Sequence, residues 1–203
     1  MVLAAGSGQR YGGPKHELDL GGLPLWKRSV SVLESAGIDT VIVVGPVDGG
    51  IPGGARRRDS VAAGLAKIPD SVEWVLIHDA ARPLITRRLV ATVVDAARIG
   101  NSDGVIPALA VTDTLKLVDG DTVLKTVDRS QIAAVQTPQA FRTRLLREAH
   151  LIDPEDDATD DAGLIERIGG TVTIVPGDRT NIKITYEGDL ELAERLIKGL
   201  QDE

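Results

Sequence analysis

Short apolar runs alternate with amphipathic stretches along most of the chain. The apolar runs carry many β-branched residues, which is typical of strands buried in a sheet. The predicted strands are residues 1–3, 40–44, 74–77, 104–109, 171–175 and 181–184. Between most of them, hydrophobic residues recur with the spacing of a helix that packs one face on a sheet. Four predicted helices cover residues 25–36, 87–99, 141–150 and 187–200. A fifth begins at the arginines at 56–58 and ends at about residue 68, and a sixth begins at the cap at 159–162 and ends at residue 168.

Residues with strong positional preferences mark the ends of these helices. Pro24 and Gly37 bracket the first helix, and Thr86 and Gly100 bracket another, as an N-cap and a C-terminal glycine do. Thr185 can cap the last helix. Because strands alternate with helices, the chain is predicted to be an α/β protein. Its sheet is expected to be mostly parallel and twisted, with right-handed crossovers and helices on both faces.

One segment breaks the alternation. Residues 114–118 and 121–127 alternate apolar and polar positions around Asp119-Gly120, which predicts a β-hairpin with an Asp-Gly turn. No predicted helix covers this hairpin, and an isolated hairpin is only marginally stable. We expect it to pack on a second subunit; the alternative is an edge hairpin within one monomer.

The opening of the chain is a candidate phosphate-binding loop. An apolar strand runs into Ala4-Ala5-Gly6-Ser7-Gly8, and Arg10 and Lys15 follow. Glycines let the backbone approach a phosphate closely, and successive N–H groups can form an anion-binding concavity. The Walker pattern fails because Pro14 and His16 flank Lys15, and the dinucleotide fingerprint fails because Tyr11 stands where its third glycine is required. The alternative is an ordinary strand-to-helix turn.

Two further strand ends carry candidate site residues. Asp79 follows the strand at 74–77, and ligands of parallel sheets lie beyond the carboxyl ends of the strands. Asp79 is therefore a candidate Mg²⁺ ligand, with a loop cap as the alternative. His78 is expected to have a structural partner. Lys183 alternates with two isoleucines, so it faces away from them, either toward the site or toward solvent on a sheet edge.

Two charged helix starts call for different explanations. Arg56, Arg57 and Arg58 stand where the helix dipole prefers anions, so a bound anion would explain them; the alternative is a solvated cluster. A polar loop at 153–157 precedes the second helix start. There Asp160 and Asp161 suit the dipole and are expected to be structural.

Composition narrows the class of protein. The chain has 203 residues, no cysteine and a formal net charge of −7, so disulfides, thiolate metal sites and non-specific nucleic-acid binding are not expected. Aromatic residues make up 2% of the chain, too few for a base-stacking surface. With no predicted membrane span or signal peptide, we expect a cytoplasmic protein. The length fits one domain, residues 1–203, with the hairpin arm at about 110–133.

Six motifs, in this order, resemble the 2-C-methyl-D-erythritol 4-phosphate cytidylyltransferase family over about residues 1–198. The motifs are Ala4-Ala5-Gly6-Ser7-Gly8 with Arg10 and Pro14-Lys15, His78-Asp79-Ala80-Ala81-Arg82-Pro83, Val111-Thr112-Asp113-Thr114, Thr126-Val127-Asp128-Arg129, Gln136-Thr137-Pro138-Gln139 and Asn181-Ile182-Lys183-Ile184-Thr185. The resemblance implies a Rossmann-like nucleotidyltransferase fold and a homodimer formed through the protruding hairpin arm. It also implies cytidylyl transfer from CTP to a small polyol phosphate in non-mevalonate isoprenoid biosynthesis.

The resemblance also implies roles for individual residues. Arg10, Lys15 and Lys183 would be catalytic, Asp79 would bind Mg²⁺, and Arg57 matches a family arginine. The implied nucleotide-binding residues are Ala4, Ala5, Gly6, Gly54, Ala55, Ser60 and Ala80. The implied polyol-phosphate site consists of Asp79, Arg82 and Thr137 of one subunit with Thr114 and Arg129 of the other.

Two other functions remain open at this point. A ribitol-5-phosphate cytidylyltransferase of the same superfamily would use the same fold with another acceptor. A non-catalytic nucleotide-binding regulator would bind CTP without releasing pyrophosphate, although the set of Arg10, Lys15, Asp79 and Lys183 argues against it.

Overall fold

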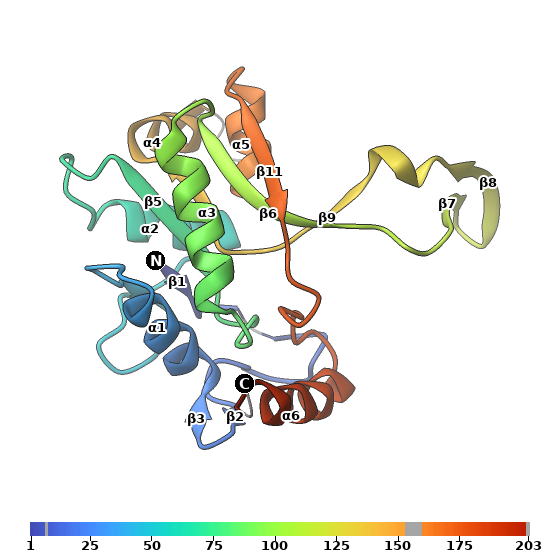
Figure 1. Cartoon of the computed structure of the whole chain (residues 1–203), viewed down its shortest axis with the longest axis horizontal. Helices are drawn as coiled ribbons and strands as arrows, with labels where there is room; N and C mark the ends of the chain where they lie inside the picture. Colours follow the sequence, from blue (N-terminus) through green and yellow to red (C-terminus); the bar gives the residue numbers. More distant parts are fainter. Residues whose placement is uncertain (7, 153–159, 202–203) are drawn as a thin grey trace.

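The computed structural model describes residues 1–6, 8–152 and 160–201 and is built on one mixed sheet (Figure 1). Seven strands form the sheet in the order β11-β6-β10-β5-β1-β4, with β9 paired to β6. The strands are β1 (Val2–Leu3), β4 (Val43–Val44), β5 (Trp74–Asp79), β6 (Gly104–Ala110), β9 (Ala133–Val135), β10 (Gln139–Arg142) and β11 (Val172–Pro176). Ser7, the polar loop predicted at 153–157 and Thr159 of the predicted cap lie outside the described residues.

Helices cover both faces of the sheet, as the sequence predicts. The helices are α1 (Leu25–Ser35), α2 (Arg57–Leu65), α3 (Arg87–Ile99), α4 (Thr143–Ile152), α5 (Asp161–Arg167) and α6 (Glu187–Gln201). On one face, α2, α4 and α5 bury a cluster that includes Leu65, Leu146 and Ile165 against the strands. On the other face, α1 and α3 pack through Leu33 and Val90. Helix α6 packs on a small hairpin, β2 (Asp19–Leu20) and β3 (Leu23–Pro24), rather than on the sheet.

The main pairings confirm a mostly parallel α/β fold, in which β10 and β9 are the two antiparallel strands. Strand β1 pairs in parallel with β4 and β5, and β11 pairs in parallel with β6. Strand β10 is antiparallel to both β5 and β6 and lies between them. The prediction of a helix beginning at Phe141 is therefore wrong, because this fully buried residue lies in β10 and α4 begins at Thr143. The hydrogen bonds that make β10 a strand come from segments far away in sequence, so local pattern did not reveal it.

Two other local predictions are also wrong. Residues 181–184 form no strand: the segment is irregular, and the backbone N–H of Ile184 donates to the carbonyl of Ala81 (2.8 Å). The Thr185 side chain does not cap α6, because its hydroxyl donates to the carbonyl of Lys183. Instead Asp189 accepts from the N–H groups of Thr185 and Tyr186. The predicted strand at 40–44 is shortened to β4.

Other helix ends are confirmed. The hydroxyl of Thr86 accepts from the N–H of Leu89, and Gly100 ends α3 in the left-handed conformation with φ 78°. Asp160 caps α5 by accepting from the N–H of Gly163 (3.1 Å). These caps are local, so the sequence alone identifies them.

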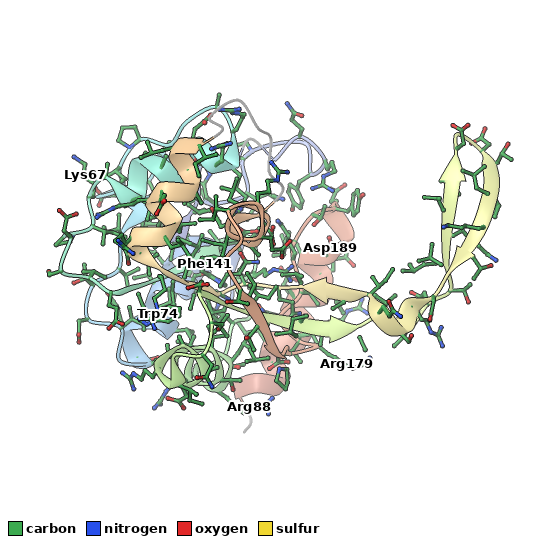
Figure 2. The ribbon with its side chains drawn as sticks, turned by 90° about the horizontal axis from the view of Figure 1, so that it is seen from above. Lys67, Trp74, Arg88, Phe141, Arg179 and Asp189 are labelled. Atoms are coloured by element: carbon green, nitrogen blue, oxygen red, sulfur yellow. The ribbon has the colours of Figure 1, made fainter. Side chains whose placement is uncertain are left out.

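A two-stranded arm stands away from the body of the molecule (Figures 1 and 2). Strands β7 (Leu115–Asp119) and β8 (Thr122–Val127) form the hairpin predicted around Gly120, whose φ of 53° suits glycine. The arm leaves the sheet after β6 and returns to it through β9. Its apolar side chains Leu117, Val118, Val123 and Leu124 are exposed. Among the described residues, no helix combines the length and the apolar character needed to cross a membrane.

Candidate active site

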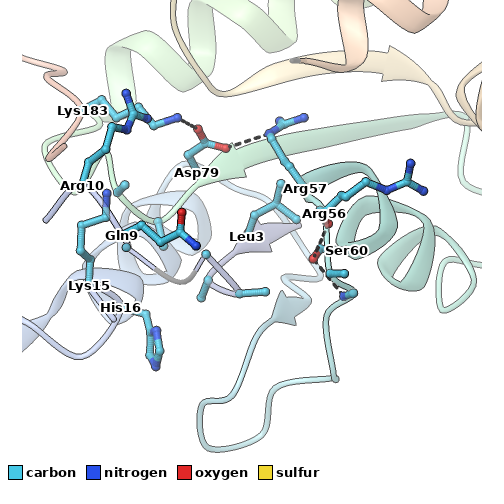
Figure 3. A pocket seen from close by; sticks show the side chains of 18 residues that line it. Leu3, Gln9, Arg10, Lys15, His16, Arg56, Arg57, Ser60, Asp79 and Lys183 are labelled. Atoms are coloured by element: carbon cyan, nitrogen blue, oxygen red, sulfur yellow. Dashed lines mark hydrogen bonds and ion pairs between the residues drawn. The ribbon is translucent and has the colours of Figure 1, made fainter. Parts of the chain in front are cut away.

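A cleft of about 560 Å³ lies at the carboxyl ends of β1 and β5 (Figure 3). Its walls come from the loop after β1, the start of α2, the end of β5 and the segment around Lys183. Eleven of the predicted site residues line it: Ala4, Ala5, Gly6, Arg10, Lys15, Gly54, Ala55, Ser60, Asp79, Ala80 and Lys183. Segments more than a hundred residues apart in sequence thus converge where parallel α/β sheets bind ligands.

The carboxylate of Asp79 is held between two cations (Figure 3). Lys183 Nζ lies 2.7 Å from Asp79 Oδ2, and Arg57 Nε lies 3.4 Å from Asp79 Oδ1. Burial alone would favour the protonated form, but Arg57 and Lys183 hold the pKa of Asp79 well below its usual range. Asp79 is therefore ionised at neutral pH.

The residues of this cleft could hold a magnesium ion only if a bound substrate supplied further oxygen atoms to it. Among the described residues, no three His, Cys, Asp or Glu side chains are grouped closely enough to hold a metal. Mg²⁺ is commonly held by one or two carboxylates, with substrate phosphates and water completing its shell. Asp79 supplies one such carboxylate, and each of its oxygens has a second lone pair beyond the contacts described. The residues therefore fit a metal that arrives with a polyphosphate.

The left wall of the cleft in Figure 3 is cationic. Lys15 Nζ donates to the carbonyl of Ile184 (2.8 Å), which anchors the glycine loop to the segment that carries Lys183. Burial and the repulsion of Lys183 and Arg10 lower the pKa of Lys15. Asp79 and Asp189 offset only part of the repulsion at Lys15, so this wall suits a phosphate chain.

The arginines at the start of α2 need no bound anion to explain them. Arg56 pairs with Asp59 (2.8 Å). Arg57 pairs with Asp161 (2.7 Å) as well as with Asp79. Arg58 is buried, so the solvated-cluster alternative is wrong for it. The tertiary fold supplies the two carboxylates that balance Arg57, Asp59 of the same helix start balances Arg56, and Arg58 donates to the carbonyl of His150.

The opposite wall is shaped by two glycines and a serine. The hydroxyl of Ser60 accepts from the N–H of Gly54 (3.1 Å) and lies 3.3 Å from the carbonyl of Arg56. A Cβ at Gly53 would come within 2.4 Å of the side chain of Ala5, so only glycine fits there. The close approach of Gly53 to Ala5 sets the distance between the loop before α2 and the loop after β1.

Behind Asp79, a chain of hydrogen bonds explains why His78 is buried. The N–H of Asp79 donates to Thr137 Oγ1 (3.1 Å), which lies 3.0 Å from His78 Nδ1. His78 Nε2 lies 3.2 Å from the carbonyl of Arg82. A carbonyl can only accept, so Nε2 carries the proton and Nδ1 accepts from the Thr137 hydroxyl. The expected structural role of His78 is confirmed, and its ring is neutral.

The other predicted acceptor-site residues lie outside the cleft wall. Thr137 is buried behind Asp79, and Arg82 donates to the carbonyls of Asn181 and Val135. Thr114 and Arg129 lie at the base of the arm, just before β7 and just after β8, and Arg129 donates to the carbonyl of Thr112 (2.5 Å). Neither of them lines the cleft of its own chain.

Seven lining residues were not among the predicted site residues. Three are the apolar Leu3, Gly8 and Ala81, and four have polar side chains: Gln9, His16, Arg56 and Arg57. Sequence spacing identifies Gln9 and His16 only as neighbours of Arg10 and Lys15. The sequence indicates Arg57 by its position at a helix start and by its match to a family arginine, but its contact with Asp79 depends on the tertiary fold.

The fold and the cleft define a nucleotide-binding α/β protein of Rossmann-like type, with a glycine loop and converging cations at the strand ends. The family model described as "IspD: 2-C-methyl-D-erythritol 4-phosphate cytidylyltransferase" matches residues 1–199, and the chain belongs to that family. Members of the family are cytidylyltransferases.

Individual relatives agree with this assignment. The 2-C-methyl-D-erythritol 4-phosphate cytidylyltransferase of Rhodococcus jostii is 43% identical over 215 residues, covering 98% of this chain and 94% of the relative. The crystal structure of the enzyme of that name from Thermus thermophilus is 37% identical, with a TM-score of 0.83 and 97% of both chains covered. A bifunctional enzyme IspD/IspF of Solidesulfovibrio magneticus is 45% identical over 96% of this chain, which spans 56% of that relative's length.

Acid should destabilise the fold through His78. Burial lowers the pKa of His78 to about 4 from its ordinary 6.5. Between these values the unfolded chain binds a proton that the folded chain does not, so stability falls as the pH falls. The loss reaches about 1.4 kcal/mol per pH unit. Denaturant unfolding of the unaltered chain and of His78→Gln, followed from pH 7 to pH 4, should show the steeper loss only in the unaltered chain. Parallel profiles would contradict the assignment of a neutral, buried imidazole.

Proposed function

We propose that the chain transfers a cytidylyl group from CTP to 2-C-methyl-D-erythritol 4-phosphate, releasing pyrophosphate, in non-mevalonate isoprenoid biosynthesis. The observation that carries the proposal is the cleft in which Asp79 is held between Arg57 and Lys183, beside Lys15 and Arg10. The family model and the relatives support the acceptor, because their names carry it. They do not favour ribitol 5-phosphate, and the intact cationic cleft argues against a non-catalytic regulator.

The chemistry needs positioning and charge neutralisation more than acid–base catalysis. An acceptor phosphate oxygen forms a bond to the α-phosphorus of CTP, and the bond to the pyrophosphate oxygen breaks. Nucleophile and leaving group are both anionic, so no covalent intermediate or strong base is required. Arg10 and Lys15 bind the triphosphate, and Lys183 contacts the reacting α-phosphate. Asp79 would hold Mg²⁺, which neutralises phosphate charge when it is bound.

The remaining residues divide between the nucleotide and the acceptor. Ala4, Ala5 and Gly6 hold the nucleoside and phosphates, Gly54, Ala55 and Ser60 read the cytosine, and Ala80 lies beside the nucleotide. The Ser60 hydroxyl already bonds to Gly54 and Arg56, which supports an indirect role through the shape of the loop. The acceptor contacts are assigned to Asp79, Arg82 and Thr137 of one subunit and to Thr114 and Arg129 of the other.

We assign the remaining properties on the same basis. Residues 1–203 form one nucleotidyltransferase domain, and the arm at about 110–133 joins two copies into a homodimer. The exposed apolar side chains of the arm support this, because such a patch is costly in water. The protein works in the cytoplasm with CTP and a small polyol phosphate, without nucleic acid or membrane.

Pyrophosphate release tests the function directly. In the presence of Mg²⁺ and methylerythritol phosphate, we expect release with CTP but little with UTP or ATP. Release should stop when the acceptor is omitted. Faster turnover with ribitol 5-phosphate would identify that compound as the acceptor. Binding of CTP without release of pyrophosphate would indicate a non-catalytic regulator.

Substitution of Lys183 tests the contact with the α-phosphate. Lys183→Ala should lower kcat about 100-fold, roughly the effect of removing one transition-state donor, while the Kd for CTP changes much less. Steady-state assays and calorimetry separate the two effects. The control is Lys67→Ala, which removes an exposed lysine far from the cleft. An unchanged kcat would remove Lys183 from the reaction.

Mixing two defective subunits tests the shared acceptor site. Arg129→Ala should raise KM for the polyol phosphate and spare CTP binding, because Arg129 lies on the arm and outside the cleft of its own chain. Mixed with Lys183→Ala subunits below KM, a two-fold dimer would regain about a quarter of the activity, since one site of each mixed dimer is intact. Activity that stays at the level of the separate variants after verified subunit exchange would contradict the sharing.

A further inference from the structure

Arg57 connects the cleft to a carboxylate outside it. Its Nε lies 3.4 Å from Asp79 Oδ1 at the cleft wall, and its Nη1 lies 2.7 Å from Asp161 Oδ2. Asp161 does not line the cleft; it begins α5, on the far side of Arg57. The shorter and better-formed contact of the guanidinium is therefore the one away from the cleft.

Asp161 is itself fixed in place. Its side chain is 1% exposed, and His150 Nε2 of α4 lies 3.1 Å from its Oδ1. Burial opposes ionisation, but the hydrogen bond with His150 and the charge of Arg57 lower the pKa of Asp161. A buried carboxylate that loses its partner is costly, so Arg57 and Asp161 hold each other in one geometry.

The two cations on Asp79 differ in how firmly they are held. The guanidinium is a planar, rigid fork, so a contact at Nη1 also fixes where Nε points. Lys183 has a flexible stem and a more exposed side chain, 39% against 24% for Arg57, and Asp79 is its only described side-chain partner. Arg57 is therefore the more firmly held of the two cations that contact Asp79.

We propose that Asp161 is a positioning residue that acts through Arg57: it holds the guanidinium so that the Asp79 carboxylate keeps one orientation when nucleotide enters the cleft. The inference rests on the proposed function, because it takes Asp79 as the group that meets the metal-bound triphosphate. It assigns Asp161 more than the helix-start role that the sequence indicates. Helix α5, which contributes no residue to the cleft wall, would then control the geometry at the strand end.

Charge-neutral and matched variants test the role of Asp161. Asp161→Asn keeps the shape and removes the charge that holds Arg57. We expect kcat to fall 10- to 100-fold and the Kd for CTP with Mg²⁺, measured by calorimetry, to rise about tenfold. Asp161→Glu should recover part of both losses. The control is Asp160→Ala, which weakens the cap of the same helix without touching Arg57 and should leave kcat and Kd unchanged.

A double-mutant cycle separates a positioning role of Asp161 from a role that only stabilises the packing of α5. In the Arg57→Ala background, Asp161→Asn should change the Kd for CTP with Mg²⁺ by less than twofold, because the residue through which it acts is gone. An equal effect in both backgrounds, or a loss of unfolding stability with unchanged kcat and Kd, would overturn the inference. Absence of turnover in the unaltered chain would count against the proposed function instead. The double-mutant cycle would still test the role of Asp161, because it compares Kd values for CTP with Mg²⁺ and needs no turnover.

Discussion

The carboxylate of Asp79, which is only 14% exposed, is the constraint on which the rest of the site depends. Burial at the end of a central strand raises the pKa of a carboxylate, and cations from α2 and from the segment after β11 lower the pKa of Asp79 again. These two ion pairs hold the start of α2 on one side of the end of β5 and the segment around Lys183 on the other. The cleft is the space left between those segments and the glycine loop. Charge pairing and cleft shape therefore have the same cause.

Strand β10 supports this arrangement from behind. It inserts antiparallel between β5 and β6, and the segment leading into it brings Thr137 to the end of β5. There the Thr137 hydroxyl links the N–H of Asp79 to a neutral His78. The strand end is thus held by hydrogen bonds at the back and by ion pairs at the front. An electrostatic site of this kind is effective because its groups are oriented before the ligand binds.

The arm lies outside this network. Its apolar residues are exposed, and Thr114 and Arg129 lie at its base, beyond the cleft of their own chain. In the proposed dimer, one requirement explains both facts: the arm buries its apolar surface on a second copy and brings its polar base to that copy's cleft. Acceptor binding would then depend on association, while nucleotide binding would need only one chain.

The sequence by itself determined the features that are encoded locally. The α/β class, the caps at Thr86, Gly100 and Asp160, the Asp-Gly hairpin and eleven residues of the cleft wall followed from pattern, motif and resemblance. Only the tertiary structure decided that Gln139–Arg142 is a strand and that residues 181–184 are not, because both depend on partners distant in the chain. The pairing of Arg57 with Asp161 was likewise invisible, since it joins residues 104 positions apart. Local pattern encodes what each segment prefers, and the sheet order decides which charges meet.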